Sequence, residues 1–186
     1  SGSYSGTRMD SDATNRTKLI SVDNWGNDGF TSFNSAFNSC SKLSKLPNGS
    51  ITGANNVTSF DSVFANCTSL TSIPIGLFDN CSNLTSFDYC FANCTSLTSI
   101  PVDLFKYNVN VTSFYYCFGG CKRLSLPTTL FNLSALQNKQ PSINLCFYVE
   151  SASDSPTGTV QALWSYITIS SNNSCFLDCT ALTNYA

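Results

Sequence analysis

The sequence contains no histidine among its 186 residues, and this absence narrows the chemistry that the chain can perform. Histidine is the commonest general base in enzymes and the commonest side-chain metal ligand, so catalytic arrangements that pair it with serine or cysteine are excluded. The eleven acidic residues are scattered along the chain. We therefore expect that the chain is not an enzyme and uses neither a cofactor nor a metal.

Charged residues are also scarce, at 11% of the sequence, and the formal net charge is −2. A chain without a basic patch is a poor partner for nucleic acid or for an anionic membrane surface. No apolar run approaches the roughly 18 residues that a membrane span needs. Hydrophobic residues still make up 42%, enough for a sizeable core, so the polar surface is built from Ser, Thr and Asn.

A regular repeat runs through the chain. It is plainest in the cysteines and phenylalanines, where Cys67 and Cys94, like Phe64 and Phe91, are separated by the same step in residue number. The step becomes slightly longer before Phe147 and again before Phe176. Such periodicity predicts a solenoid, because one repeat cannot bury its apolar face alone. The repeated positions, which we expect to form structural ladders, are Cys40, Cys67, Cys94, Cys121, Cys179, Phe37, Phe64, Phe91, Phe118, Phe147 and Phe176.

Each repeat predicts two kinds of element. Phe60, Val63, Phe64 and Cys67 have the i, i+3, i+4, i+7 spacing of a short helical or 3-10 segment. Leu70–Ile73 is typical of a short strand that Pro74 ends, and Leu43–Leu46 and Leu97–Ile100 are its equivalents. Stacked repeats would align these strands in parallel, about 4.8 Å apart. The expected fold is therefore an α/β repeat solenoid.

The repeats also suggest how the chain is divided. We expect a flexible N-terminal segment over residues 1–17 and a solenoid over 18–186. The solenoid would have a half-repeat cap at 18–29, regular repeats at 30–131 and longer divergent repeats at 132–186, since the ends of a stack need covering. The sequence ends soon after the cysteine of a repeat, and we expect the natural protein to continue.

The motif Phe-Ala-Asn-Cys-Thr-Ser-Leu-Thr-Ser-Ile-Pro occurs at residues 64–74 and again at 91–101. It resembles the BspA-like leucine-rich-repeat family, found on the surfaces of anaerobic and mucosal bacteria and of some protozoan parasites. The resemblance extends from Lys18 nearly to the end of the chain. It implies a right-handed leucine-rich-repeat coil, an extracellular place on a bacterial cell surface, and adhesion to host matrix or neighbouring cells.

Two functions agree with these features. The first is a binding module that presents its repeated surface to a protein or glycan of a host or neighbouring cell. The second is a structural spacer that holds another domain away from the cell. An enzyme is the third class, and the missing histidine argues against it. The oligomeric state is left open by the sequence.

Ten cysteines invite other interpretations. Cys90 and Cys94, like Cys117 and Cys121, form Cys-Phe-x-x-Cys units, which elsewhere suggest redox chemistry or zinc. Zinc thiolates must converge on one point, whereas these thiols would be spread along the axis of the solenoid. We expect buried, reduced thiols, with disulfides between stacked neighbours as the alternative.

The candidate binding residues lie on columns of exposed positions. Tyr89 and Tyr116 are separated by one full repeat, and Tyr115 follows Asp61 and Asp88 in the adjacent column. Tyrosine is a large amphipathic contact residue that loses little conformational entropy on binding. The predicted contact surface consists of Tyr89, Tyr115, Tyr116, Lys122 and Arg123, with the face at Thr71, Ser72, Thr98 and Ser99 as the alternative.

Overall fold

The computed structural model describes residues 13–25, 32–126 and 141–148, together with the backbone of two short strands. Helix α1 (Ala13–Arg16) precedes the repeats and falls within the segment 1–17 that the sequence predicts to be flexible. Strands β1 (Gly158–Thr159) and β2 (Leu182–Thr183) pair in parallel, with Gly158 opposite Leu182. No helix in the described part of the chain is long and apolar enough to cross a membrane.

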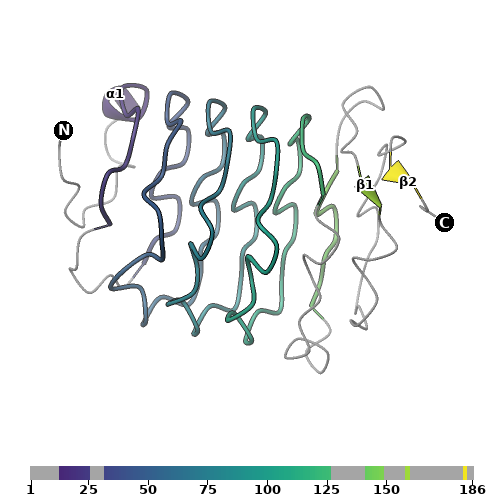
Figure 1. The fold of residues 1–186 in the computed structure, drawn as a ribbon. Coiled ribbons are helices and arrows are strands. Elements are labelled where there is room, and N and C mark those ends of the chain that lie inside the picture. The colour runs from purple at the N-terminus through teal and green to yellow at the C-terminus, as the bar shows by residue number, and fades with distance from the viewer. Residues whose placement is uncertain (1–12, 26–31, 127–140, 149–157, 160–181, 184–186) are drawn as a thin grey trace.

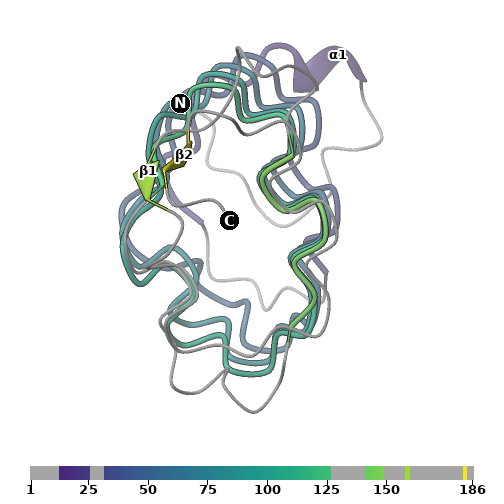
Figure 2. The ribbon, with the colours of Figure 1, turned by 90° about the vertical axis from the view of Figure 1, so that its right-hand side faces the viewer.

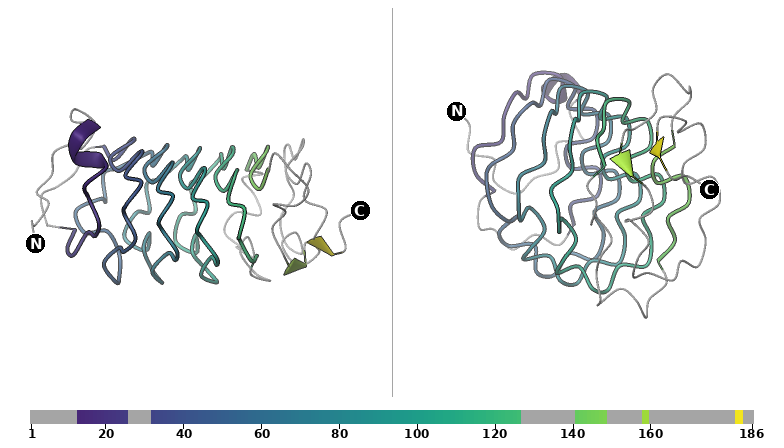
Figure 3. Two further views of the ribbon diagram at one scale, coloured as in Figure 1. Left: turned by 90° about the horizontal axis from the view of Figure 1, so that it is seen from above. Right: turned by 45° about the vertical axis from the view of Figure 1, so that its right-hand side comes forward.

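Successive repeats form coils that lie side by side (Figure 1), and they superimpose when viewed along the stack (Figure 2). The view from above and the oblique view show the same row of coils (Figure 3). Single parallel bridges connect them, for example from Ser72 to Ser99. The strands predicted at Leu70–Ile73 and Leu97–Ile100 are thus reduced to one bridged residue each. A second row of bridges links Ser59, Ser86, Ser113 and Ser142.

The segments predicted to be helical are turns. Residues 61–66 contain two residues in the left-handed region, Ser62 with φ 57° and Asn66 with φ 61°. Tyr89 and Asn93 repeat these values, 57° and 58°, one coil later. A helix needs φ near −60° at every residue, so two left-handed residues four apart interrupt it. The prediction of a short helical segment is therefore wrong at residues 61–66.

The turn segment satisfies its backbone N–H groups in two directions. The N–H groups of Ser62, Phe64 and Asn66 donate to carbonyls of the following coil, at distances of 2.7–2.9 Å. The three residues between and after them donate to carbonyls three positions earlier in their own coil. Alternate N–H groups therefore close the turn and attach the next coil, which leaves none of these donors unpaired.

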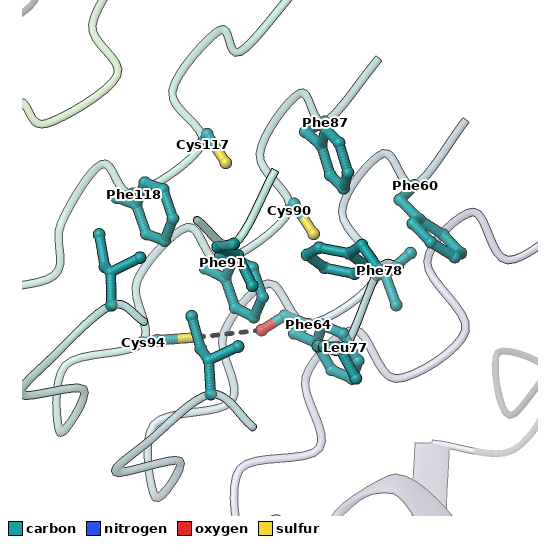
Figure 4. Packing of buried hydrophobic residues seen from close by; sticks show 14 of the residues in the cluster. Phe60, Phe64, Leu77, Phe78, Phe87, Cys90, Phe91, Cys94, Cys117 and Phe118 are labelled. Atoms are coloured by element: carbon teal, nitrogen blue, oxygen red, sulfur yellow. Dashed lines mark hydrogen bonds between the residues drawn. The ribbon is translucent and has the colours of Figure 1, made fainter. Parts of the chain in front are cut away.

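The core consists of columns of phenylalanine rings inside the coils (Figure 4). Phe64, Phe91 and Phe118 are stacked nearly parallel, with ring centroids 5.3 and 5.4 Å apart, and all are buried. The stacking extends to Phe37 at one end and to Phe147 at the other, each 5.6 Å from its neighbour. Each coil thus buries its apolar side against the coils on either side.

The start of the stack is covered by the half-repeat. Ser21 is bridged to Lys45, and the Val22 N–H donates to the Lys45 carbonyl at 3.0 Å. The buried indole of Trp25 meets the ring of Phe37 edge-on, with centroids 6.1 Å apart. The part of the predicted cap (18–29) that the structure describes therefore pairs with the first coil.

Candidate binding surface

Four tyrosine rings from three successive coils contact one another. Tyr89 lies 5.3 Å from Tyr115 and 5.4 Å from Tyr116, measured between ring centroids. Tyr116 in turn lies 5.8 Å from Tyr148 on the next coil. We call these four residues the tyrosine cluster. The structure brings together the three tyrosines that the sequence singles out and adds Tyr148, which the sequence analysis missed.

Two members of the cluster have a backbone conformation that tyrosine rarely adopts. Tyr89 and Tyr116 have φ of 57° and 52°, and this left-handed region is unfavourable for a bulky L-residue. Ser35 and Ser62 occupy the same position in the two preceding coils, each with φ 57°. Because serine fulfils the turn with a smaller side chain, the turn does not require the tyrosine rings. Strained residues of this kind gather at functional sites.

Gly119 allows the Tyr116 ring to lie close to the backbone. A Cβ atom added to Gly119 would stand 2.3 Å from two atoms of the Tyr116 ring. The preceding coils have Ala65 and Ala92 at this position. The absence of a side chain at residue 119 therefore coincides with the coil in which an aromatic ring occupies the space.

The two aspartates of the adjacent column hold neighbouring coils together. Asp61 Oδ1 accepts hydrogen bonds from the Ser86 hydroxyl at 2.5 Å and from the Asp88 N–H at 3.1 Å. Asp88 Oδ1 accepts the equivalent bonds from Ser113 at 2.5 Å and from the Tyr115 N–H at 2.8 Å. The carboxylates are thus partly buried inter-coil acceptors, and Asp88 fixes the backbone from which the Tyr115 ring extends.

Tyr89 presents a neutral hydroxyl at physiological pH. Desolvation raises the pKa of this hydroxyl above its ordinary value, and a hydrogen bond with Tyr115 and the charge of Asp88 raise it further. Tyr89 is also the most open member of the cluster, with 41% of its surface exposed, whereas the other three are half-buried. The surface therefore offers an aromatic ring with a protonated hydroxyl.

Residues 31–153 match a family described as "Mycoplasma protein of unknown function, DUF285". The chain belongs to this family. All four residues of the tyrosine cluster lie within the matched region of this DUF285 protein. No curated protein and no solved structure matches the chain.

The other residues predicted to contact a ligand of this DUF285 protein are exposed. Lys122 and Arg123 lie on the turn that follows Cys121. Thr71, Ser72, Thr98 and Ser99 form the second exposed surface, and the Thr98 hydroxyl donates to the Thr71 carbonyl at 3.2 Å. Hydroxyls of this face are therefore partly used to hold adjacent coils together.

The repeated cysteines of the DUF285 chain are buried. The thiols of Cys67, Cys94 and Cys121 each donate, at 3.2 Å, to the carbonyl of a phenylalanine in the preceding coil. Burial raises the pKa of Cys121 to about 12 and that of Cys40 to about 11. A neutral thiol with a hydrogen-bond acceptor is a poor nucleophile, because the thiolate is the reactive form.

The eight cysteines in the described residues are all free thiols, and no group of metal-binding side chains gathers there. Phe37, Phe64, Phe91, Phe118 and Phe147 of the predicted ladder are buried with them. Cys179 and Phe176 lie outside the described residues.

Proposed function

We propose that this DUF285 chain is a cell-surface or secreted binding module for a protein or glycan ligand of a host or neighbouring cell. In this proposal the stacked coils are a leucine-rich-repeat solenoid of the BspA-like kind, located outside a bacterial cell and without catalytic activity. The observation that carries the proposal is the tyrosine cluster, whose rings occupy strained positions that serine fills in earlier coils.

A contact surface of this kind has a clear energetic advantage. Aromatic residues dominate the binding energy of interfaces, and tyrosine loses little rotamer entropy when a ligand immobilises it. Here the rings of Tyr115, Tyr116 and Tyr148 already support one another and Tyr89. Much of the ordering cost is therefore met during folding, which leaves more of the contact energy for binding.

The test compares two variants that remove exposed tyrosines from different places. Tyr89→Ser/Tyr116→Ser gives the cluster positions the residue found at Ser35 and Ser62, so the fold is expected to persist. Tyr107→Asn removes a tyrosine that is 48% exposed elsewhere on the same stack, and Asn80 is its equivalent one coil earlier. Binding of the labelled chain to epithelial cells or immobilised matrix proteins is measured by titration.

We expect the double variant to lose binding while Tyr107→Asn retains it, with similar melting temperatures for all three proteins. Equal binding by all three would move the contact surface to another face, such as Thr71 and Thr98. Saturable binding by none of them, including the unaltered chain, would favour the structural spacer instead.

A further inference from the structure

The tyrosine cluster ends abruptly at Tyr89. The preceding coil has Ser62 at the equivalent position, and the two residues are direct neighbours. The Ser62 N–H donates to the Asp88 carbonyl at 2.9 Å, and the Phe64 N–H donates to the Cys90 carbonyl at 2.9 Å, on either side of Tyr89. The surface therefore rises from a small hydroxyl side chain to a large aromatic ring within one coil.

The lower side of this step carries hydrogen-bonding groups. Asp61 adjoins Ser62 in sequence, and its Oδ1 is held by Ser86 and by the Asp88 N–H. A carboxylate has about four lone-pair sites, so Asp61 can still accept through Oδ2. Ser62 adds a hydroxyl that both donates and accepts. An aromatic wall thus stands beside a fixed carboxylate and a hydroxyl group.

We propose that Tyr89, together with Ser62 and Asp61, binds a neutral sugar ring of a glycan. This inference rests on the proposed binding function and names its ligand class. A pyranose has one face made of C–H groups with positive partial charge, which complements the negative face of an aromatic ring. Its hydroxyls at the ring edge would meet Asp61 and Ser62, because a carboxylate accepts from hydroxyl donors and a serine can do both.

The surroundings favour a sugar over a protein ligand. A protein hot spot is an aromatic anchor in a desolvated pocket with an apolar core around it. The residues next to Tyr89 in the preceding coil, Asp61 and Ser62, are instead polar and partly exposed. Neutral hydroxyls also suit a surface on which charges are scarce, at 11% of the sequence. The ring spacings of 5.4 and 5.8 Å along the cluster are close to the length of one sugar unit, so a linear glycan could extend from Tyr89 over Tyr116.

The experiment titrates the purified full chain with cellotetraose, chitotetraose, N-acetyllactosamine and mannotriose, followed by NMR and tyrosine fluorescence. We expect saturable binding of at least one of these sugars. Tyr89→Ser should weaken it about tenfold, which corresponds to about 1.4 kcal/mol. Tyr89→Phe should retain most of the affinity, because the aromatic face remains. Asp61→Asn, which copies Asn34 of the preceding coil, should weaken binding by a smaller factor, and Tyr107→Asn should have no effect.

A parallel arm separates this inference from the proposed function. The chain is added to epithelial cells before and after enzymatic removal of surface glycans. Loss of binding after the treatment supports the sugar site. Cell binding that survives deglycosylation, with no response to any of the four sugars, would overturn the sugar site but leave a protein-binding module. Sugar binding that is unchanged in Tyr89→Ser would also overturn it. An absence of cell binding before treatment would count against the proposed function itself.

Discussion

The ring of Tyr116 can approach the backbone because residue 119 has no side chain. In the second coil the corresponding pair is Ser62 and Ala65, and in the third it is Tyr89 and Ala92. A tyrosine with an alanine three residues later is thus possible, but Tyr89 is then largely exposed. The Tyr116 and Gly119 pair gives the more buried ring that contacts both Tyr89 and Tyr148.

Gly119→Ala should displace the Tyr116 ring, since the new methyl group would stand 2.3 Å from it. Forcing an extra methyl group into a packed site costs about 1–3 kcal/mol. The measurement is the free energy of unfolding in urea, together with the tyrosine signal in near-ultraviolet circular dichroism. Tyr116→Ser/Gly119→Ala reproduces the Ser62 and Ala65 pair and should recover most of the loss. A double variant as unstable as Gly119→Ala would show that the ring is not the source of the cost.

Buried thiols should make the stability depend on pH in the alkaline range. Burial raises the pKa of Cys81 from 9.0 to about 12, and the charge of Asp79 contributes in the same direction. Between these values the unfolded chain releases the proton and the folded chain keeps it, so stability falls as pH rises from about 9 to about 12. One such group contributes a slope of up to about 1.4 kcal/mol per pH unit.

Cys81→Ala isolates this contribution, because Ala54 occupies the same position one coil earlier. The variant should be slightly less stable at pH 7 and should lose stability less steeply than the parent chain above pH 9. Urea unfolding at pH 7, 9, 10 and 11 provides the comparison. Two curves that run parallel across this range would contradict the assignment of the slope to Cys81.

At this scale the sequence predicts neighbours better than it predicts contacts. The constant step of the repeat places Tyr89 next to Tyr116, and their rings do lie 5.4 Å apart. Tyr148 could not be found this way, for two reasons. Its repeat is longer than the regular ones, and it stands in the column of Ala65 and Ala92 rather than in the column of Tyr89. It reaches Tyr116 only because Gly119 leaves the space open.

The element that forms each coil is a turn that exchanges hydrogen bonds with the next coil. Its apolar residues have helical spacing, which is why the sequence predicts a helix at 60–67. The distinction lies in Ser62 and Asn66, whose left-handed conformations break the helix and point alternate N–H groups toward the following coil. Serine and asparagine are compatible with both structures, so the apolar pattern cannot distinguish them.

The phenylalanine column is the element that carries most of the packing. Phe91 is fully buried between Phe64 and Phe118 and also contacts Phe78, 6.1 Å away. Phe91→Ala should cost about 3–5 kcal/mol, the usual range for a buried phenylalanine. Val102→Ala, in the next coil but 57% exposed, is the control and should change stability by less than about 0.5 kcal/mol.

Hydrogen exchange would show where the damage from Phe91→Ala is felt. Each coil contacts only its neighbours, so a break in the middle should let the two sides open at different denaturant concentrations. We expect amides near Phe37 and near Phe118 to lose protection at separate urea concentrations in the variant. A single concerted loss of protection, or a stability equal to that of the parent chain, would show that the column does not couple the coils.

At the scale of the whole molecule, stability should grow with the number of coils. In the regular coils the hydrogen bonds, phenylalanine contacts and serine bridges between coils connect a residue to its counterpart, or a close neighbour of it, one repeat away, so each coil depends on the two beside it. Such a molecule has no single centre. Its stability is approximately the sum of coil terms and nearest-neighbour interface terms.

A second copy of residues 84–110 inserted after residue 110 should therefore fold as one more coil. The insertion keeps the period, so Phe91 of the copy would stack between the original Phe91 and Phe118, and the cluster would gain a tyrosine. The added coil should lengthen the molecule by about 5 Å, the spacing of hydrogen-bonded neighbours, in small-angle X-ray scattering. The urea m-value should also rise, because more surface is exposed on unfolding. The matched control inserts the same segment in scrambled order, which should loop out and leave both quantities unchanged. An ordered insert that behaved like the scrambled one would mean that contacts beyond nearest neighbours determine how the coils stack.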